Sequence, residues 1–234
     1  MSQPFLSLPG SCVQAVFLKR EKRFIVHGLL NHTAVTAHTN NSGSMLGLLR
    51  PGRSMLLSPA DNPRRKLPYT LELIRHENFW VGVNTLIPNR MLKLAWNKRL
   101  IPELEGFTAF RSEAGTEGSR LDACLEGQKG RLWVEAKNVT LVEDGRACFP
   151  DAPSVRARRH MLELARLAGS GDKAACFYLV QRPDCSCFGP ADFIDQDFAR
   201  ALEEAVHNGL EIWAYKTRID QQGISLDQRL PLVW

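Results

Sequence analysis

Two acidic residues and a lysine lie at a spacing that two paired strands would bring together. Asp122 and Glu135 fall in two apolar stretches separated by the glycine-bounded turn of residues 126–130, a pattern typical of a β-hairpin. In a hairpin symmetric about that turn, Asp122 faces Glu135, and such cross-strand neighbours have Cβ atoms about 4.5–5.5 Å apart. Lys137 follows Glu135 by two positions and therefore points to the same face. The spacing predicts a group of two carboxylates and one ammonium.

Two carboxylates held opposite each other repel, so this pairing needs a compensating positive charge. A divalent cation would supply it, since Mg²⁺ commonly takes one or two carboxylates together with phosphate oxygens and water. Lys137 alone would also offset part of the repulsion, and a register slip of one residue would separate the two acids. Glu113, just before a turn that starts and ends with glycine, is a candidate third acid; an exposed strand-end carboxylate fits this position equally well.

The excess of basic over acidic residues lies entirely in the first third of the chain. Residues 1–85 hold 10 Lys and Arg against 4 Asp and Glu, whereas residues 86–234 hold 20 against 21. A basic module joined to a neutral one is typical of proteins that bind a polyanion such as DNA. A general bias toward solubility would give the same imbalance.

The residues that we predict to contact DNA come from two basic runs and one helix face. The helix positions are spaced i, i+3 and i+4, so they align on one side, and basic side chains suit contacts with the phosphate backbone. A solvated surface is the alternative for each run and for the helix face. The predicted contacts are Arg20, Lys22, Arg23, Arg64, Arg65, Lys66, Arg156, Arg159 and His160.

The elements that would position these residues change in type near residue 85. Residues 1–85 show short apolar and β-branched stretches between turn residues, which favours a small OB-like β-barrel. Residues 86–234 predict a mixed-sheet domain, so the fold class is α/β (α+β) with two domains. In the second domain, the predicted helices cover 87–98, about 154–168 and about 191–207, and the predicted strands cover 107–113, 120–125, 131–141, 174–180 and 210–216.

The composition argues against a membrane protein or a disulfide-rich protein. No apolar run approaches the ~20 residues needed to span a bilayer. Pro4, Pro9 and Gly10 interrupt the apolar residues near the start, so no secretory signal is predicted. None of the six cysteines forms a C-x-x-C pair, which disfavours a zinc site. We expect a cytoplasmic protein with reduced thiols, and the sequence leaves the oligomeric state open.

Asp122 followed by Glu135-Ala136-Lys137 resembles the PD-(D/E)xK nuclease pattern. The resemblance implies that Asp122 and Glu135 bind Mg²⁺ or Mn²⁺, and that Lys137 positions or activates the attacking water. The setting of this short motif, on paired strands followed by a helix, matches the core of that superfamily.

An ordered set of short stretches runs along the chain and includes residues 41–45, 65–73, 119–122, 134–141 and 149–152. Through this set the chain, from about residue 12 to residue 230, is similar to the bacterial sugar fermentation stimulation protein A family. The resemblance implies an N-terminal OB-type barrel, a C-terminal nuclease-like domain and DNA binding. Two departures are Ala136, where the family usually has Val, and Ala157, where it tends to have Gly.

Three classes of function are considered for these features. The first is a DNA-binding phosphodiesterase, in which the barrel grips the DNA backbone with low sequence specificity and the carboxylates hold the metal. The alternative is a non-catalytic, largely nonspecific DNA-binding regulator of sugar metabolism. A scaffold protein without nucleic acid is the third class. The sequence does not distinguish single-stranded from double-stranded DNA, nor exonuclease from endonuclease cutting.

Overall fold

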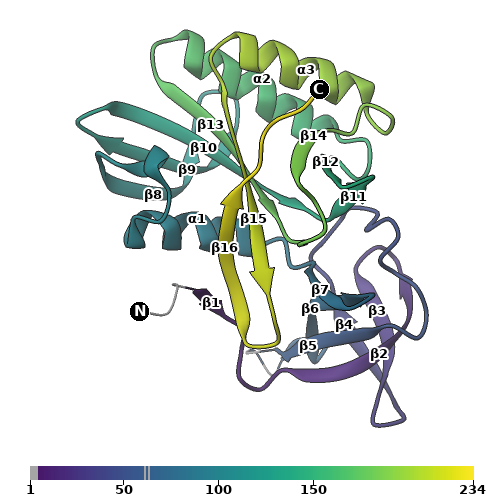
Figure 1. Cartoon of the computed structure of the whole chain (residues 1–234). Coiled ribbons are helices and arrows are strands. Elements are labelled where there is room, and N and C mark those ends of the chain that lie inside the picture. The colour runs from purple at the N-terminus through teal and green to yellow at the C-terminus, as the bar shows by residue number, and fades with distance from the viewer. Residues whose placement is uncertain (1–4, 61, 63) are drawn as a thin grey trace.

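The computed structural model describes residues 5–60, 62 and 64–234, which form a β-barrel below a larger module built on one sheet (Figure 1). Five strands close the barrel in the ladder order β4-β3-β2-β5-β6, because β6 also pairs with β4 in parallel. This confirms the OB-like barrel. The strands are β2 (Val13–Glu21), β3 (Ile25–Leu30), β4 (Thr33–His38), β5 (Ser54–Pro59) and β6 (Tyr69–His76), followed by β7 (Phe79–Gly82), which pairs with β6.

The larger module is a mixed seven-stranded sheet with the order β1-β16-β15-β13-β10-β9-β8. Its centre is parallel, with β10, β13 and β15 running the same way, and antiparallel strands lie on both sides. The mixed sheet is as predicted. The strands are β1 (Phe5–Ser7), β8 (Phe107–Gly115), β9 (Arg120–Gly127), β10 (Gly130–Val139), β13 (Lys173–Val180), β15 (Glu211–Ile219) and β16 (Gly223–Arg229).

Helices cover both faces of this sheet. Helix α1 (Ile87–Lys98) packs on one face, and helices α2 (Val155–Gly169) and α3 (Gln196–His207) pack on the other. The alternation of β13 explains the two cores, since Phe177 belongs to the α1 side and Tyr178 to the α2 and α3 side. The smaller elements are a 3₁₀ turn (Pro102–Leu104) and a three-stranded sheet of β11 (Leu141–Glu143), β12 (Arg146–Phe149) and β14 (Cys187–Pro190).

Helix α3 begins five residues later than the sequence pattern predicts. Strand β14 continues to Pro190, and a turn then occupies the segment before Asp195. Asp195 is the N-cap of α3, where its side chain accepts a hydrogen bond from the Phe198 backbone N–H at 3.0 Å. The other carboxylate oxygen accepts from the backbone N–H of Ser154 at 2.8 Å. Because Ser154 is itself the N-cap of α2, Asp195 fixes the starts of both helices.

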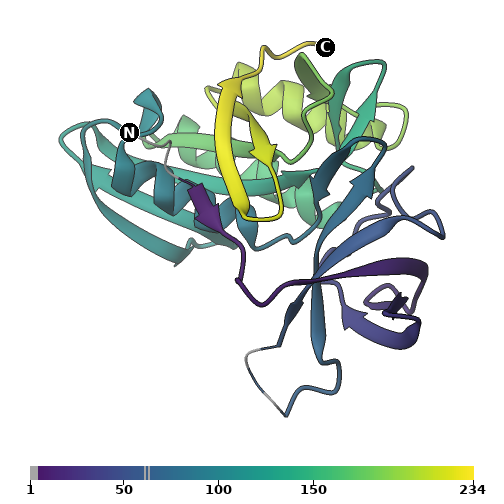
Figure 2. The ribbon, with the colours of Figure 1, turned by 60° about the horizontal axis from the view of Figure 1, so that its bottom comes forward.

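The first strand belongs to the sheet module and not to the barrel. Strand β1 pairs antiparallel with β16, so Leu6 lies opposite Ile224 at the edge of the seven-stranded sheet (Figure 2). The chain then crosses to the barrel, returns after β7 and completes the sheet. The predicted division at residue 85 therefore separates β1 from the sheet in which it pairs.

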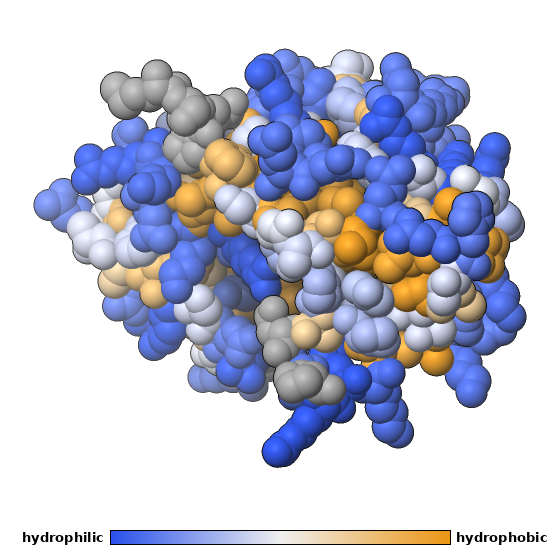
Figure 3. Space-filling view, turned by 90° about the horizontal axis from the view of Figure 1, so that it is seen from below, coloured by the Kyte–Doolittle hydropathy of each residue, from blue (hydrophilic) through white to orange (hydrophobic). Residues whose placement is uncertain are grey.

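The face of the molecule seen from below mixes polar and apolar side chains (Figure 3). Seen from below, the molecule shows mostly hydrophilic side chains, with apolar patches and a hollow left of the centre (Figure 3). In the part of the chain that the structure describes, no helix has the length and apolar character needed to cross a membrane.

The close approach of β8 and β9 generates a stability prediction. A Cβ atom at Gly127 would overlap the Gly106 carbonyl oxygen and lie 2.7 Å from the Cα of Phe107, so backbone would have to move. We expect Gly127→Ala to lower the free energy of unfolding by about 1–3 kcal/mol, the usual cost of overpacking. Urea unfolding measures this. Gly115→Ala in β8 is the control, because a Cβ there meets nothing within 4 Å; equal stability of the two variants would contradict the prediction.

Candidate metal and phosphodiester site

The hairpin of β9 and β10 brings Asp122 near Glu135. Side-chain hydrogen bonds, in addition to the strand pairing, fix the position of the Asp122 carboxylate. The ladder has the predicted register from Gly130 opposite Gly127 to Val134 opposite Ala123. At the next position, the Asp122 carboxylate accepts a hydrogen bond from the Ala136 backbone N–H at 2.8 Å. Its other oxygen accepts from the Asn89 side chain of α1, also at 2.8 Å. Asp122 is thus tied to β10 and to a helix on the α1 face.

Glu135 is held from the opposite side of the sheet. Only 3% of the residue is exposed. One carboxylate oxygen, Oε1, accepts a hydrogen bond from Lys137 Nζ at 2.6 Å and also makes a short contact with His160 Nδ1. Lys137 Nζ lies 3.4 Å from the same His160 nitrogen. The second oxygen, Oε2, is buried and has no hydrogen-bond partner among the described residues.

The two carboxylates have pKa values shifted in opposite directions. Burial and then the charge of Glu135 raise the pKa of Asp122. Burial also raises the pKa of Glu135, but Lys137 and His160 together outweigh it and lower that pKa to about 2. The site therefore stabilises one negative charge on Glu135 and disfavours the second on Asp122. A further cation beside Asp122 would remove this penalty.

The barrel forms one wall of the cavity in which these groups lie. The cavity has a volume of about 480 Å³, and its walls come from both modules. The loop before Met45 is docked on Asp151, whose carboxylate accepts from the Met45 backbone N–H at 2.8 Å and whose carbonyl accepts from Ser44 Oγ. A Cβ atom at Gly43 would overlap the Asp151 carboxylate, so glycine permits this contact. The lining residues include Arg23, Asn41, Thr85, Asn89, Asp122, Glu135, Lys137, Asp151, Ser154 and Arg156.

Comparisons with known proteins agree with this two-module arrangement. The family model described as the sugar fermentation stimulation protein RE domain matches residues 86–223, and the one described as the SfsA N-terminal OB domain matches residues 18–83. The chain belongs to the sugar fermentation stimulation protein family. The matched RE-domain residues contain α1, α2 and α3 and the strands from β8 to β15.

Relatives in this family cover nearly the whole chain. A sugar fermentation stimulation protein homolog of Syntrophobacter fumaroxidans is 57% identical over 231 residues, 98% of this chain and 88% of the relative. A homolog of Maridesulfovibrio salexigens is 48% identical over 235 residues, 99% of this chain and 98% of the relative. The structure of Pyrococcus furiosus SfsA in complex with Ca²⁺ has a TM-score of 0.93 and 28% sequence identity, covering 100% of both chains.

The residues predicted to contact DNA lie in different places within this family fold. Arg23 and Arg156 line the cavity of the carboxylates. Arg159 and Lys22 are exposed, as is Arg64. Arg65 and Lys66, which follow Arg64 in the same basic run, line a separate cavity.

Three predicted residues take positions other than those expected. Arg20 donates to the Gly43 and Asn41 carbonyls at 2.8 and 2.7 Å, so it holds the docked loop and is not free for phosphate. His160 is 2% exposed and contacts Glu135, because its helix position faces the sheet. Glu113 is exposed and forms a 2.8 Å ion pair with Arg120, outside the lining of the carboxylate cavity.

The donor set fits a divalent cation with few protein ligands. Among the described residues, no group of three His, Cys, Asp or Glu side chains converges as a metal cage. Two carboxylates do meet, and the buried Oε2 of Glu135 lacks a partner there. Mg²⁺ is commonly held by one or two carboxylates plus phosphate oxygens and water, so a full protein cage is not required.

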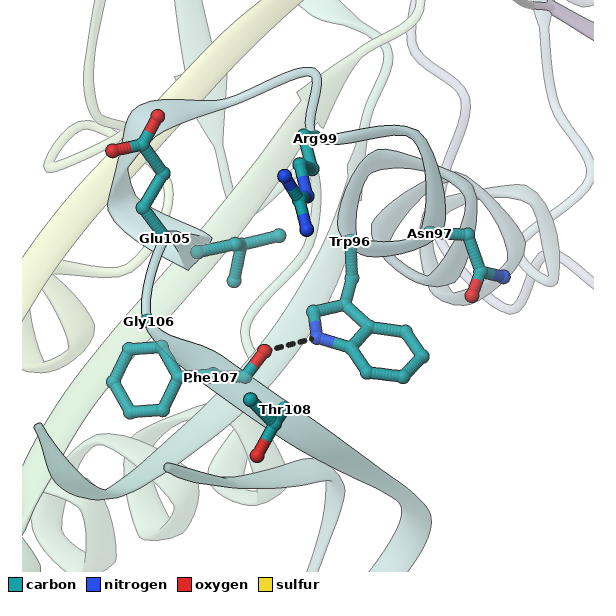
Figure 4. A pocket seen from close by; sticks show the side chains of 8 residues that line it. Trp96, Asn97, Arg99, Glu105, Gly106, Phe107 and Thr108 are labelled. Carbon is teal, nitrogen blue, oxygen red and sulfur yellow. Dashed lines mark hydrogen bonds between the residues drawn. The ribbon is translucent and has the colours of Figure 1, made fainter. Parts of the chain in front are cut away.

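A larger cavity elsewhere lacks this chemistry. It has a volume of about 670 Å³ and lies at the end of α1. Trp96 and Phe107 form part of its wall, and the Trp96 indole N–H donates to the Phe107 carbonyl at 2.8 Å (Figure 4). Its lining contains a single carboxylate, Glu105, and none of the residues predicted from the sequence. Size alone would therefore select a cavity that lacks the paired carboxylates.

The low pKa of Glu135 generates a pH prediction. Because its folded pKa is depressed, Glu135 stabilises the fold above its unfolded pKa of about 4.5, and this contribution is lost as pH falls toward about 2. We expect the stability advantage of wild type over Glu135→Gln to shrink between pH 5 and pH 3. Urea unfolding at both pH values measures it. Glu117→Gln, at a side chain that is 93% exposed, is the control; an advantage that grows on acidification would contradict the prediction.

Proposed function

We propose that this chain is a metal-dependent phosphodiesterase that acts on DNA. The observation that carries the proposal is the buried Glu135 Oε2, which lacks a partner among the described residues and belongs to the carboxylate beside Asp122. Burying an ionised carboxylate is costly unless its oxygens are satisfied. A divalent cation shared by Glu135 and Asp122 would satisfy Oε2 and offset the repulsion between the two acids.

Mg²⁺ or Mn²⁺ held by these carboxylates would polarise a phosphodiester and lower the pKa of a nearby water. The chain's own groups have separate tasks. Asn89 and the Ala136 N–H fix Asp122, and His160 fixes Glu135 from the helix side. Lys137, at 2.6 Å from Glu135, is a charged donor placed to orient the attacking water. These contacts come from a strand and two helices, so the groups are held before substrate arrives.

DNA is supported as the substrate by charge and by the family. Arg23 from the barrel and Arg156 from α2 line the carboxylate cavity on its two sides, where they suit phosphates flanking the cleaved one. The basic excess of the first 85 residues adds a sequence-independent attraction. The Ca²⁺ complex of the Pyrococcus furiosus relative supports a divalent cation in this fold.

Cleavage assays test the reaction. We expect wild type to cut single- or double-stranded DNA in Mg²⁺ or Mn²⁺ and to be inactive in EDTA. Lys137→Ala and Asp122→Asn should each lose about 10²-fold or more in rate, since they remove a water-positioning group and a metal ligand. Glu113→Gln is the matched control and should retain activity, because its carboxylate is exposed and paired with Arg120. DNA binding without cutting would contradict the proposal and favour the regulator.

Metal binding is measurable without turnover. A ligand that binds only the folded state at about 100 times its Kd stabilises the protein by about 2.7 kcal/mol. We therefore expect Mn²⁺ to raise the melting temperature of wild type. Asp122→Asn should abolish the shift because one anionic ligand is lost, and Glu113→Gln should preserve it. An equal shift in Asp122→Asn and wild type would place the metal elsewhere.

A further inference from the structure

A second polar cavity lies between the barrel and the start of α1. Its volume is about 610 Å³, within the ~300–1,000 Å³ range of small-ligand pockets. Strands β5 and β6 and the intervening loop contribute Ser58, Glu72 and Arg65, and the segment entering α1 contributes Asn84 and Arg90. The cavity is therefore built by both modules, like the carboxylate site.

The wall of this cavity holds a buried carboxylate in a neutral hydrogen-bond chain. Glu72 is 6% exposed, and its Oε1 accepts from Ser58 Oγ while its Oε2 accepts from Asn84 Nδ2, both at 2.7 Å. Asn84 Oδ1 in turn accepts from Asn40 Nδ2 at 2.6 Å. Within the described residues, no Lys, Arg or His forms an ion pair with Glu72. Each carboxylate oxygen can accept more than one hydrogen bond, so Glu72 retains acceptor capacity.

Cations surround the same cavity at the surface. Arg65, Lys66 and Arg90 all line it and all are exposed. None of the three has an acidic ion-pair partner in the described parts of the chain; Arg65 donates only to Thr70 Oγ1 among the side-chain contacts recorded there, at 3.1 Å. A buried acceptor beneath three unpaired cations suits a ligand that has N–H donors at one end and a phosphate at the other.

This cavity adjoins the carboxylate site. Asn40 lines both cavities, and its Oδ1 accepts from the Thr85 backbone N–H at 3.0 Å. Two neighbouring residues of α1 line different cavities. Asn89 lines the carboxylate cavity and donates to Asp122, whereas Arg90 lines the second cavity. A DNA strand with one phosphate at Asp122 would therefore bring an adjacent nucleotide to Glu72.

We infer that the Glu72 cavity is a nucleotide subsite that receives an unpaired guanine next to the phosphodiester to be cut, an inference that rests on the proposed function. Guanine carries two neighbouring N–H donors on its Watson–Crick edge, which match the two oxygens of one carboxylate. Adenine and thymine lack such a pair. The edge is free only in an unpaired base, so the subsite selects single-stranded DNA. Arg65, Lys66 and Arg90 hold the phosphates of that nucleotide.

Binding of short oligothymidylates in EDTA tests the subsite without cleavage. We expect wild type to bind an oligomer with one central guanine about tenfold tighter than one with a central adenine, the scale of a good bidentate contact. Deoxyinosine, which lacks the second donor, should bind between them. Glu72→Gln, similar in size, should reduce the guanine preference to less than about twofold. Arg90→Ala, at an exposed position, should weaken all three oligomers alike.

The outcomes separate this inference from the proposed function. Equal affinity for guanine and adenine, or a guanine preference unchanged in Glu72→Gln, overturns the subsite even if the protein cuts DNA. Guanine preference lost in Glu72→Gln supports it even if no cutting is seen. If Glu72→Gln does not fold, as judged by its thermal melt, the comparison of guanine with deoxyinosine on wild type decides alone: equal affinities overturn the subsite.

Discussion

The site depends on one electrostatic constraint: the buried carboxylate of Glu135 and the partly buried carboxylate of Asp122 repel each other where the β9–β10 ladder ends. An unpaired buried charge is expensive, and a second one beside it more so. Groups from three elements contact the two carboxylates. Asn89 of α1 and the Ala136 N–H of β10 donate to Asp122, and Lys137 of β10 and His160 of α2 contact Glu135. One oxygen of Glu135 still lacks a partner within the described chain. The proposed metal would bind this remaining carboxylate oxygen.

The barrel completes the site as well as carrying charge. Its loop before Met45 is held internally by Arg20 and docked externally on Asp151. Arginine in this position acts through its geometry, because the planar guanidinium donates to two carbonyls at once. The loop thereby becomes a fixed wall of the carboxylate cavity. The barrel and the larger module both line this one cavity, and neither surrounds it alone.

Short-range patterns in the sequence predicted the features of the structure that depend on residues close together in the chain. The turn between β9 and β10 set the register that brings Asp122 to Glu135, and the 87–98 helix agrees with α1. Long-range partners could not be derived in this way. Asn89 meets Asp122 across 33 positions, and the inward direction of His160 depends on how α2 rotates on the sheet. The spacing of Arg156, Arg159 and His160 predicts one shared side of a helix, whereas in α2 the two arginines are exposed and His160 is buried against Glu135.

The pairing of β1 with β16 has a consequence for how the chain can be divided. Because the sheet takes a strand from before the barrel and the rest from after it, the barrel is in effect inserted into the larger module and tethered at both ends. Large swings of one module away from the other would have to strip β1 from its ladder. A fragment starting at residue 86 would lack β1 and leave the edge of β16 open, and open strand edges promote association between chains. Separate production of the larger module therefore calls for β1 to be kept, joined through a short linker in place of the barrel.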